Sequence, residues 1–262
     1  MAQQTQIDRV VSFYGSWIGK YPSFRSLGQA SRGDILRLWS GLGYNSRAVR
    51  LHELARTIVS EFNGNLPETE EELRRLPGIG RYTASAIACF AFGADVAVVD
   101  VNVRRVFSRS LFVVRAQNEL RPEEEIWTMA QQYLPRTKSG EWNQALMDLG
   151  ARVCTARNPH CEQCPINSLC RSAFSKVLFA TPPKKEKREP SFKGVPRRIY
   201  RGRILKAVHD KALTLHQIGK RVVSNFHHRD IFWLEGVVRR LERDSLVTIF
   251  GNGENKKVGV VP

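Results

Sequence analysis

Apolar residues recur at helical spacing through the first two thirds of the chain. Side chains at i, i+3, i+4 and i+7 lie on one face of a helix. The clearest sets are Leu51, Leu54, Ala55 and Ile58, and then Val103, Val106 and Phe107. Residues 1–175 lack convincing alternation of apolar and polar positions, which would indicate half-buried strands. The pattern therefore predicts a bundle of short helices over residues 1–175.

Two of the predicted helices are joined by a glycine-rich turn. We expect helices over residues 70–76 and 83–92, with Pro77-Gly78-Ile79-Gly80 between them. Glycine permits a left-handed backbone and a close approach by a ligand. Backbone N–H groups at the start of a helix can bind an anion such as a DNA phosphate. The alternative is an ordinary turn between helices.

The last third of the chain has a different pattern. Residues 179–198 are rich in Pro and Lys and nearly free of large apolar residues, which is typical of a linker. Beyond it we expect helices over residues 199–209, from Thr214, whose spacing to Gln217 is that of a capping box, and over 230–243. The hairpin 246–250 and 257–261 follows. Three helices closed by a basic hairpin resemble a winged-helix domain over residues 199–262.

Most of the excess positive charge of the chain lies in this last third. The 262 residues include 41 Lys and Arg against 25 Asp and Glu, a net charge of +16. Residues 184–262 alone hold 19 basic and 8 acidic residues. Such an excess favours a polyanionic partner, of which nucleic acid is the commonest, over a merely solvated basic surface. A hydrophobic fraction of 42% excludes wholesale disorder. We find neither an apolar run of membrane-spanning length nor a secretory signal, and expect a cytoplasmic protein.

Four of the five cysteines fall within 17 residues. Cys154, Cys161, Cys164 and Cys170 have the spacing C-x6-C-x2-C-x5-C. Their clustering indicates a metal or cluster site in a reducing compartment rather than a disulfide framework. A [4Fe–4S] cluster and a zinc ion are both possible, and the wide outer gaps favour the cluster. The remaining Cys89 lies in an apolar run and is interpreted as a core thiol.

One carboxylate follows the glycine-rich turn by twenty residues. Asp100 ends an apolar stretch and precedes the helix that contains Val103. The residue could simply cap that helix. It could instead stabilise a sugar cation, since a carboxylate at the positive end of a helix stays ionised at neutral pH.

Taken together, these features resemble the helix-hairpin-helix DNA glycosylase superfamily of the endonuclease III type. The segments that resemble it, and more closely its adenine DNA glycosylase (MutY) family, are LWSGLGYNSRAVRLHELA, LPGIGRYTASAI, VVDVNVRRV and NQALMDLGARVC. The resemblance covers about residues 1–175. It implies a mainly α fold, with a six-helix domain over residues 1–107 and a cluster domain over 108–178. It also implies that the four cysteines bind a [4Fe–4S] cluster.

The resemblance assigns roles to the residues of the turn and of the next helix. Gly78 and Gly80 are expected to present backbone N–H groups to a DNA phosphate, with Arg81 beside them. Asp100 matches the family's aspartate, which stabilises the oxocarbenium-like sugar as the base departs. Asn102 matches the asparagine that orients the sugar or base.

Further matches concern the DNA strands. Gln3 and Gln4 match glutamines that fill the gap left by a flipped base, and Tyr44 matches an aromatic wedge beside the opposing guanine lesion. The alternative for Gln3 and Gln4 is a frayed terminus, and the alternative for Tyr44 is an aromatic residue packed at the end of a helix. Tyr82 stands where bifunctional members carry a lysine, and because tyrosine cannot form an imine we expect no strong lyase activity.

Two departures from the family pattern lead to further expectations. The family's general-acid glutamate falls two residues before the position of Met1, so we expect this chain to be truncated or mis-started. Residues 199–262 do not resemble the family's usual Nudix-like domain, which leaves recognition of 8-oxoguanine undecided. The resemblance nevertheless predicts a monomeric, monofunctional glycosylase, associated with the nucleoid, that removes adenine opposite guanine or 8-oxoguanine from duplex DNA. Removal of mismatched thymine or uracil, and a catalytically impaired cluster protein that only binds DNA, are the alternatives.

Overall fold

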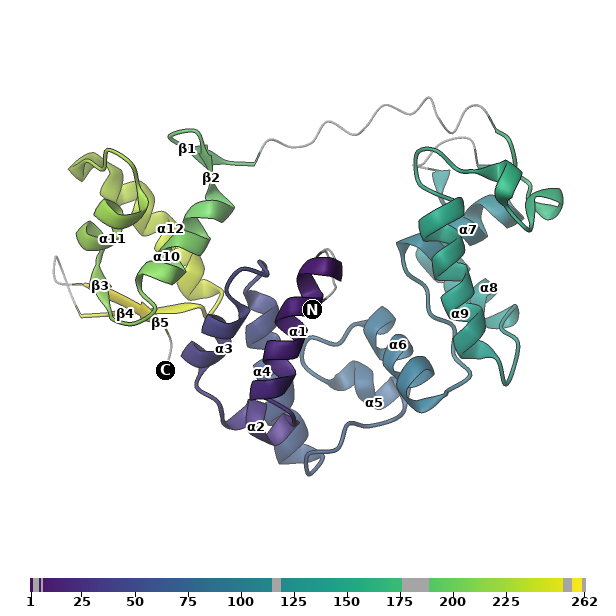
Figure 1. Cartoon of the computed structure of the whole chain (residues 1–262), viewed down its shortest axis with the longest axis horizontal. Coiled ribbons are helices and arrows are strands. Elements are labelled where there is room, and N and C mark those ends of the chain that lie inside the picture. The colour runs from purple at the N-terminus through teal and green to yellow at the C-terminus, as the bar shows by residue number, and fades with distance from the viewer. Residues whose placement is uncertain (2–4, 6, 115–118, 176–188, 252–255, 261–262) are drawn as a thin grey trace. The chain divides into compact units, whose positions relative to one another are not determined.

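The computed structural model describes residues 1, 5, 7–114, 119–175, 189–251 and 256–260. It is mainly helical, as predicted (Figure 1). The chain divides into two compact units, one formed by Met1–Leu66 with Lys187–Pro262 and the other by Pro67–Glu186. No helix in the described ranges combines the length and the apolar character needed to cross a membrane.

The first unit begins with four helices. They are α1 (Ile7–Lys20), α2 (Phe24–Gln29), α3 (Arg32–Trp39) and α4 (Ser46–Glu61). The side chain of Ser23 caps α2 and that of Ser31 caps α3, each by accepting from a backbone N–H of the first turn. The apolar face predicted on α4 is confirmed, since Leu54, Ala55 and Ile58 are buried.

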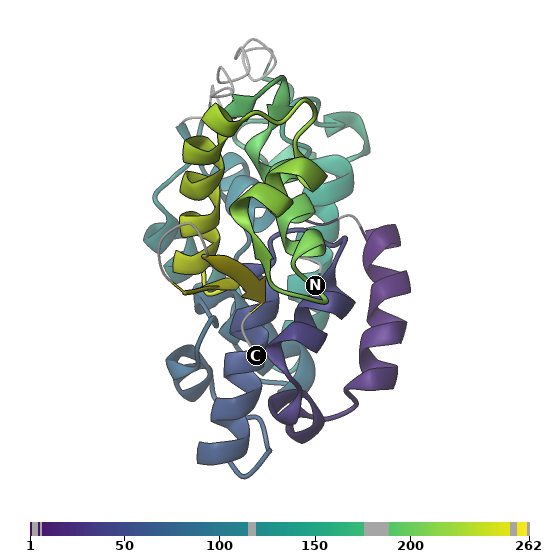
Figure 2. The same cartoon turned by 90° about the vertical axis from the view of Figure 1, so that its left-hand side faces the viewer.

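The C-terminal part of this unit contains three helices and two small sheets. Its elements are β1 (Ser191–Phe192), β2 (Val195–Pro196), α10 (Arg197–Ala207), β3 (Leu213–Thr214), α11 (Leu215–Val222), η6 (His228–Asp230), α12 (Ile231–Arg243), β4 (Val247–Phe250) and β5 (Lys257–Val260). The predicted capping box of Thr214 and Gln217 is confirmed. The hairpin is also confirmed, because β4 pairs antiparallel with β5. The strand β3 was not predicted, and it completes a sheet of order β3-β5-β4. In Figure 2 the yellow strand near the C-terminus lies below the green helices of the same part of the chain.

Regular structure begins before the predicted end of the linker at residue 198. The short strands β1 and β2 pair within that stretch, and α10 starts at Arg197. Phe192 stacks on Trp233 with ring centroids 3.8 Å apart, and it also lies edge-on to Tyr200. A single aromatic residue thus anchors the hairpin, and a composition dominated by Pro and Lys hides that anchor.

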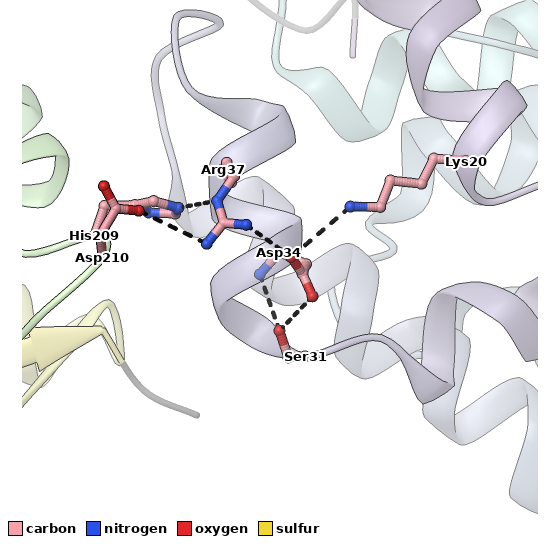
Figure 3. Close-up of polar contacts among 6 residues, drawn as sticks. All are labelled: Lys20, Ser31, Asp34, Arg37, His209 and Asp210. Carbon is pink, nitrogen blue, oxygen red and sulfur yellow. Dashed lines mark hydrogen bonds and ion pairs between the residues drawn. The ribbon is translucent and has the colours of Figure 1, made fainter.

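The two sequence segments of the first unit share one core. Trp17 and Trp39, with rings 5.3 Å apart, belong to the same buried cluster as Tyr200 and Leu234. A chain of polar contacts runs beside it (Figure 3). The Arg37 guanidinium bonds Asp34 on one side, and on the other it contacts the residues that follow α10, His209 and Asp210.

The second unit contains the hairpin and the cysteines. Its elements are α5 (Glu70–Arg75), α6 (Arg81–Phe92), α7 (Val101–Leu111), α8 (Glu123–Gln132), α9 (Ser139–Asp148), η2 (Leu149–Val153, a π-helix), and the 3-10 turns η3 (Cys161–Gln163) and η4 (Asn167–Leu169). The predicted helices around the glycine turn and at Val103 are confirmed. A core of Val103, Phe107, Ile126 and Trp127 joins α7 to α8.

Candidate active site and cluster loop

The turn between α5 and α6 has the geometry that its glycines predicted. Gly78 has a φ of +79°, in the left-handed region that favours glycine. The Ile79 N–H donates to the Leu76 carbonyl at 3.2 Å and closes the turn. Gly80 then starts α6 without any capping side chain. The helix N-terminus therefore offers backbone N–H groups, and its dipole favours an anion there.

Arg81, predicted to contact DNA, has partners within the protein. Its NH1 lies 2.5 Å from Glu124 Oε2, and its guanidinium lies 4.2 Å above the Trp127 ring. These contacts fasten the start of α6 to α8. A role of Arg81 toward DNA stays a prediction.

Asp100 is the N-cap of α7, and three donors hold its carboxylate. Oδ1 accepts from the backbone N–H groups of Asn102 and Val103 at 2.8 and 2.7 Å, while Oδ2 accepts from Asn102 Nδ2 at 2.7 Å. A carboxylate has about four acceptor positions, so one position on Oδ2 remains for a ligand. Both readings of this residue are therefore compatible, because capping the helix also fixes a half-buried negative charge at its positive end.

The side chain of Asn102 is itself held in place by a buried arginine, Arg105. Its Oδ1 accepts from Arg105 NH2 at 2.9 Å, which leaves Nδ2 directed at Asp100. Arg105 is only 7% exposed, and it also donates to the carbonyls of Gly150 at 2.6 Å and Cys154 at 2.8 Å. A continuous path of hydrogen bonds thus joins the Asp100 carboxylate to the first cysteine of the loop.

Tyr82 lies close enough to Asp100 for their charges to interact. Burial raises the pKa of the Tyr82 phenol, and the Asp100 carboxylate raises it further. The hydroxyl is therefore neutral at physiological pH, although the side chain is 38% exposed. The structure brings together Tyr82, Asp100 and Asn102, three residues that the sequence analysis named.

The four clustered cysteines line one cavity. Cys154, Cys161, Cys164 and Cys170 share it with Arg109. Burial raises the pKa of Cys170, and the other three cysteines raise it further, which reflects their proximity. Among the described residues no group of three His, Cys, Asp or Glu side chains converges as a single metal ion requires. Four thiols that line one shared cavity are a donor set of the type that holds a [4Fe–4S] cluster.

Arg109 closes this cavity on the α7 side. The side chain is 2% exposed and donates to the carbonyls of Thr155 at 2.7 Å and Ala156 at 2.9 Å, and NH1 lies 3.6 Å from Cys154 Sγ. Its positive charge lies beside the cysteines, where it would compensate the negative charge of thiolate ligands when the cluster is bound. Arg109 is thus an additional residue that the sequence analysis did not name.

Of the other predicted DNA contacts, the structure describes Tyr44, which lies in the first unit. Tyr44 is 62% exposed in the turn between α3 and α4, with a φ of +48°. It is not a packed aromatic, and its exposure is compatible with the predicted wedge. Gln3 and Gln4 lie outside the described residues.

Sequence reasoning missed Arg105 and Gly150 as well. A Cβ at Gly150 would meet Asn102 Cβ at 2.7 Å, so only glycine allows η2 to approach α7 this closely. The available signal was helical spacing, because Asn102, Arg105 and Arg109 lie at i, i+3 and i+7 on one face of α7.

Comparison with known proteins agrees with this geometry. Residues 1–132 match the profile of the HhH-GPD superfamily base excision DNA repair proteins. The adenine DNA glycosylase of Mycolicibacterium smegmatis is 36% identical over 240 residues, which cover 92% of this chain and 76% of that protein. The chain belongs to the adenine DNA glycosylase family. Within this family the human enzyme is 46% identical over 173 residues, or 66% of this chain. That match spans about a third of the human protein, 32% of its length.

Solved structures support the same fold. A thermostable thymine-DNA glycosylase superposes with a TM-score of 0.60 at 32% identity and covers 64% of this chain and 77% of its own. Endonuclease III in a trapped covalent complex with DNA gives 0.59 at 24% identity, over 66% of this chain and 79% of its own. The predicted helix-hairpin-helix fold class is therefore confirmed for this family member.

The cofactor prediction is confirmed by a second profile. Residues 154–170, from the first to the last clustered cysteine, match the iron-sulfur binding domain of endonuclease III. The glycosylase family member described here therefore binds a [4Fe–4S] cluster, and zinc is set aside.

Proposed function

We propose that this chain is a monofunctional DNA N-glycosylase that removes adenine mispaired with guanine or 8-oxoguanine from duplex DNA. The observation that carries the proposal is the Asp100 carboxylate, fixed by three donors with one acceptor position free. The names of the relatives supply the target base, since they are adenine DNA glycosylases. The protein acts as a monomer, in the cytoplasm and at the nucleoid.

Binding starts at the turn between α5 and α6. A glycosidic bond inside the stacked duplex is out of reach, so the target nucleotide has to be flipped outward. Gly78 and Gly80 hold a backbone phosphate next to that nucleotide through the N-terminal N–H groups of α6, with Arg81 beside them. In the same complex Gln3 and Gln4 contact the flipped strand and Tyr44 wedges beside the opposing base.

Bond cleavage depends on Asp100. As the glycosidic bond lengthens, the deoxyribose acquires positive charge at C1′ and O4′. A carboxylate whose donors are already in place stabilises this charge without reorganising. Asn102 orients the sugar or base from the adjacent position, and Arg105 fixes the Asn102 amide.

Water, rather than a protein amine, adds at C1′: its hydroxyl group bonds to the sugar, and a proton is delivered through solvent to the departing adenine. Tyr82 occupies the position beside Asp100, and a phenol cannot form an imine with the exposed sugar aldehyde. The product is therefore an intact abasic site. A monofunctional glycosylase of this kind removes the base and does not cleave the DNA strand.

The cluster shapes the protein around this site. We infer that Cys154, Cys161, Cys164 and Cys170 are its four ligands. The cluster supplies a rigid crosslink for the loop, and Arg105 and Arg109 connect the loop to α7. We propose domains over residues 1–107 (six-helix) and 108–178 (cluster) and a winged-helix-like domain over 199–262. The linker predicted over 179–198 is shortened at its C-terminal end by β1, β2 and the start of α10.

The test is base release from matched duplexes. The cluster-loaded chain is incubated with duplexes carrying A:8-oxoG, A:G, T:G and U:G, and abasic sites are then cleaved with alkali. We expect strand breaks with the two adenine duplexes only, and none before alkali treatment. Asp100→Asn should abolish product while the duplex still binds, whereas Asp95→Asn, at an aspartate that caps no α7 donor, should retain activity.

The remaining outcomes support other functions. Breaks only at T:G or U:G indicate a pyrimidine mismatch glycosylase, which the similarity to the thymine-DNA glycosylase makes the second candidate. Binding without product from any duplex indicates a catalytically impaired cluster protein. Activity that persists in Asp100→Asn removes Asp100 from its role.

A further inference from the structure

The helix α12 has two faces of opposite character. Its inward face is formed by Leu234, Val237, Val238 and Leu241, all buried in the core of the first unit. Its outward face is formed by Phe232, Gly236, Arg239, Arg240 and Arg243. Because these positions follow helical spacing, they form one continuous stripe along the helix.

Two members of this stripe have no role in the fold. Phe232 is 87% exposed, although exposing a large aromatic side chain loses the free energy of its burial. No atom of the described residues lies within 4 Å of the position of a Cβ at Gly236, so none of the described elements requires a glycine there. A glycine inside a helix is destabilising relative to alanine. Both residues therefore favour contact with something outside the unit.

The charges of the stripe favour an anion. Arg240 and Arg243 are exposed and form no ion pair with any residue that the structure describes. Arg239 bonds Glu235 Oε1 at 2.7 Å, and Lys256 from the β4–β5 hairpin lies 3.9 Å from the same oxygen. One acidic side chain thus holds two cations at the edge of the stripe and positions the hairpin beside α12.

We propose that the outward face of α12 is a second duplex-DNA binding surface, in which the helix enters the major groove. The major groove is about 12 Å wide and admits an α-helix. Arg240 and Arg243 neutralise phosphates, Gly236 permits close approach of the DNA, and Phe232 makes apolar contact with base edges such as a thymine methyl. Lys256 and Lys257 of the hairpin contact the neighbouring backbone. This surface is additional to the base-excision site and needs no mismatch.

The test measures binding of the cluster-loaded chain to a fully paired duplex by fluorescence anisotropy over a series of salt concentrations. The double variant Arg240→Gln/Arg243→Gln should weaken binding about ten-fold at low salt. It should also reduce the slope of log affinity against log salt by about 2, since each phosphate contact contributes about one. Phe232→Ala should weaken binding without changing that slope.

A matched control removes two other exposed cations of the same unit. Lys206→Gln/Lys211→Gln makes the same change in net charge, and it should change affinity less than two-fold. Circular dichroism confirms that each variant is folded. Equal loss in both double variants would show a general charge effect and overturn the proposal, as would tighter binding to an A-form RNA duplex or unchanged affinity in the α12 variants. Excision from A:8-oxoG at saturating enzyme is followed separately, so failure of the proposed function cannot be mistaken for failure of this surface.

Discussion

At the scale of single residues, the same three hydrogen bonds cap a helix and fix the carboxylate for which we propose a catalytic role. Capping requires an acceptor at the first turn of α7, and Asp100 satisfies two N–H groups there. The proposed catalytic role requires a carboxylate that does not move, and Asn102 Nδ2 donates the third bond that holds it. Arg105 in turn holds Asn102 in place, because its guanidinium donates to the amide oxygen of Asn102 and to two backbone carbonyls.

The first prediction follows from the shape of that guanidinium. Arg105→Lys keeps the charge but cannot satisfy three separated acceptors, so buried carbonyls lose their donor. We expect a loss on the order of 2 kcal/mol in unfolding free energy. We also expect a decrease of about ten-fold or more in the single-turnover excision rate, with the duplex still bound. Denaturant titration and rapid-quench kinetics measure the two effects.

Arg104→Lys is the control for this prediction. Arg104 is the preceding residue of α7, and its Nε donates to a single carbonyl, that of Arg121, at 2.9 Å. The Arg104→Lys variant should retain the unfolding free energy and the excision rate of the parent protein. Equal losses in the two variants would show that any arginine of α7 matters, and the particular role of Arg105 would then be rejected.

At the scale of elements, the site depends on how closely packed segments approach each other. The π-helix η2 touches α7 at Gly150, where a Cβ would lie 2.7 Å from Asn102 Cβ. In the first unit α2 and α4 pack less tightly, since a Cβ at Gly28 would lie 3.5 Å from the Ala55 backbone, an ordinary van der Waals contact. Beside that contact His52 Nε2 lies 3.3 Å from the Gly28 carbonyl, within the core.

The second prediction concerns the contact between η2 and α7. Gly150→Ala adds a methyl group where none fits, so the two elements have to separate. We expect destabilisation of about 1–3 kcal/mol, typical of overpacking, together with slower excision because Asn102 is displaced. Gly140→Ala is the matched control, since nothing lies within 4 Å of its Cβ position in α9, and it should stabilise slightly. If Gly150→Ala behaves like the control, the close approach is not required.

The third prediction concerns pH. Burial lowers the pKa of His52 from its ordinary value of 6.5. The unfolded chain therefore binds a proton more readily than the folded protein, and the contribution of His52 to stability, present above pH 6.5, is lost as the pH falls below it. The denaturation midpoint should decrease between pH 7 and pH 5.5. In the His52→Gln variant this midpoint should decrease less over the same pH range. A pH dependence identical to that of the parent protein would rule out His52 as its source.

At the scale of the whole molecule, the two units are stabilised by different means. The first has one apolar core, to which α1–α4 and the C-terminal helices both contribute. The second has a smaller core around α7 and α8, and the loop that follows η2 has few buried apolar side chains of its own. That loop depends on the cluster and on Arg105 and Arg109 for its conformation.

The fourth prediction follows from this difference. Removing the iron with a chelator should lower the thermal transition of the second unit and make residues 154–170 sensitive to protease. The transition of the first unit should remain. Differential scanning calorimetry and mass-spectrometric mapping of the cleavage sites measure this.

Two cysteine variants accompany this experiment. Cys164→Ser should reproduce the effect of the chelator, and Cys89→Ser should not, because Cys89 is buried in α6 away from the cluster cavity. A chelator effect of equal size on both units would contradict separate stabilisation.

Sequence by itself determined the features that depend on neighbouring residues. The helices around the glycine turn, the capping box at Thr214, the β4–β5 hairpin and the buried face of α12 all follow from spacing and local hydrogen bonding. The spacing of the four clustered cysteines and the position of Asp100 before a helix could be recognised for the same reason. Both features involve residues that lie close together in the sequence.

Only the tertiary structure decided which distant groups meet. The bonds from Arg105 to Gly150 and Cys154 join residues 45 and 49 positions apart, and no local pattern predicts them. The anchoring of the β1–β2 hairpin by Phe192 on Trp233 is equally nonlocal. Buried polar groups take whatever partner the fold brings within hydrogen-bond distance, so their pairing is fixed by packing of the whole unit rather than by the residues beside them.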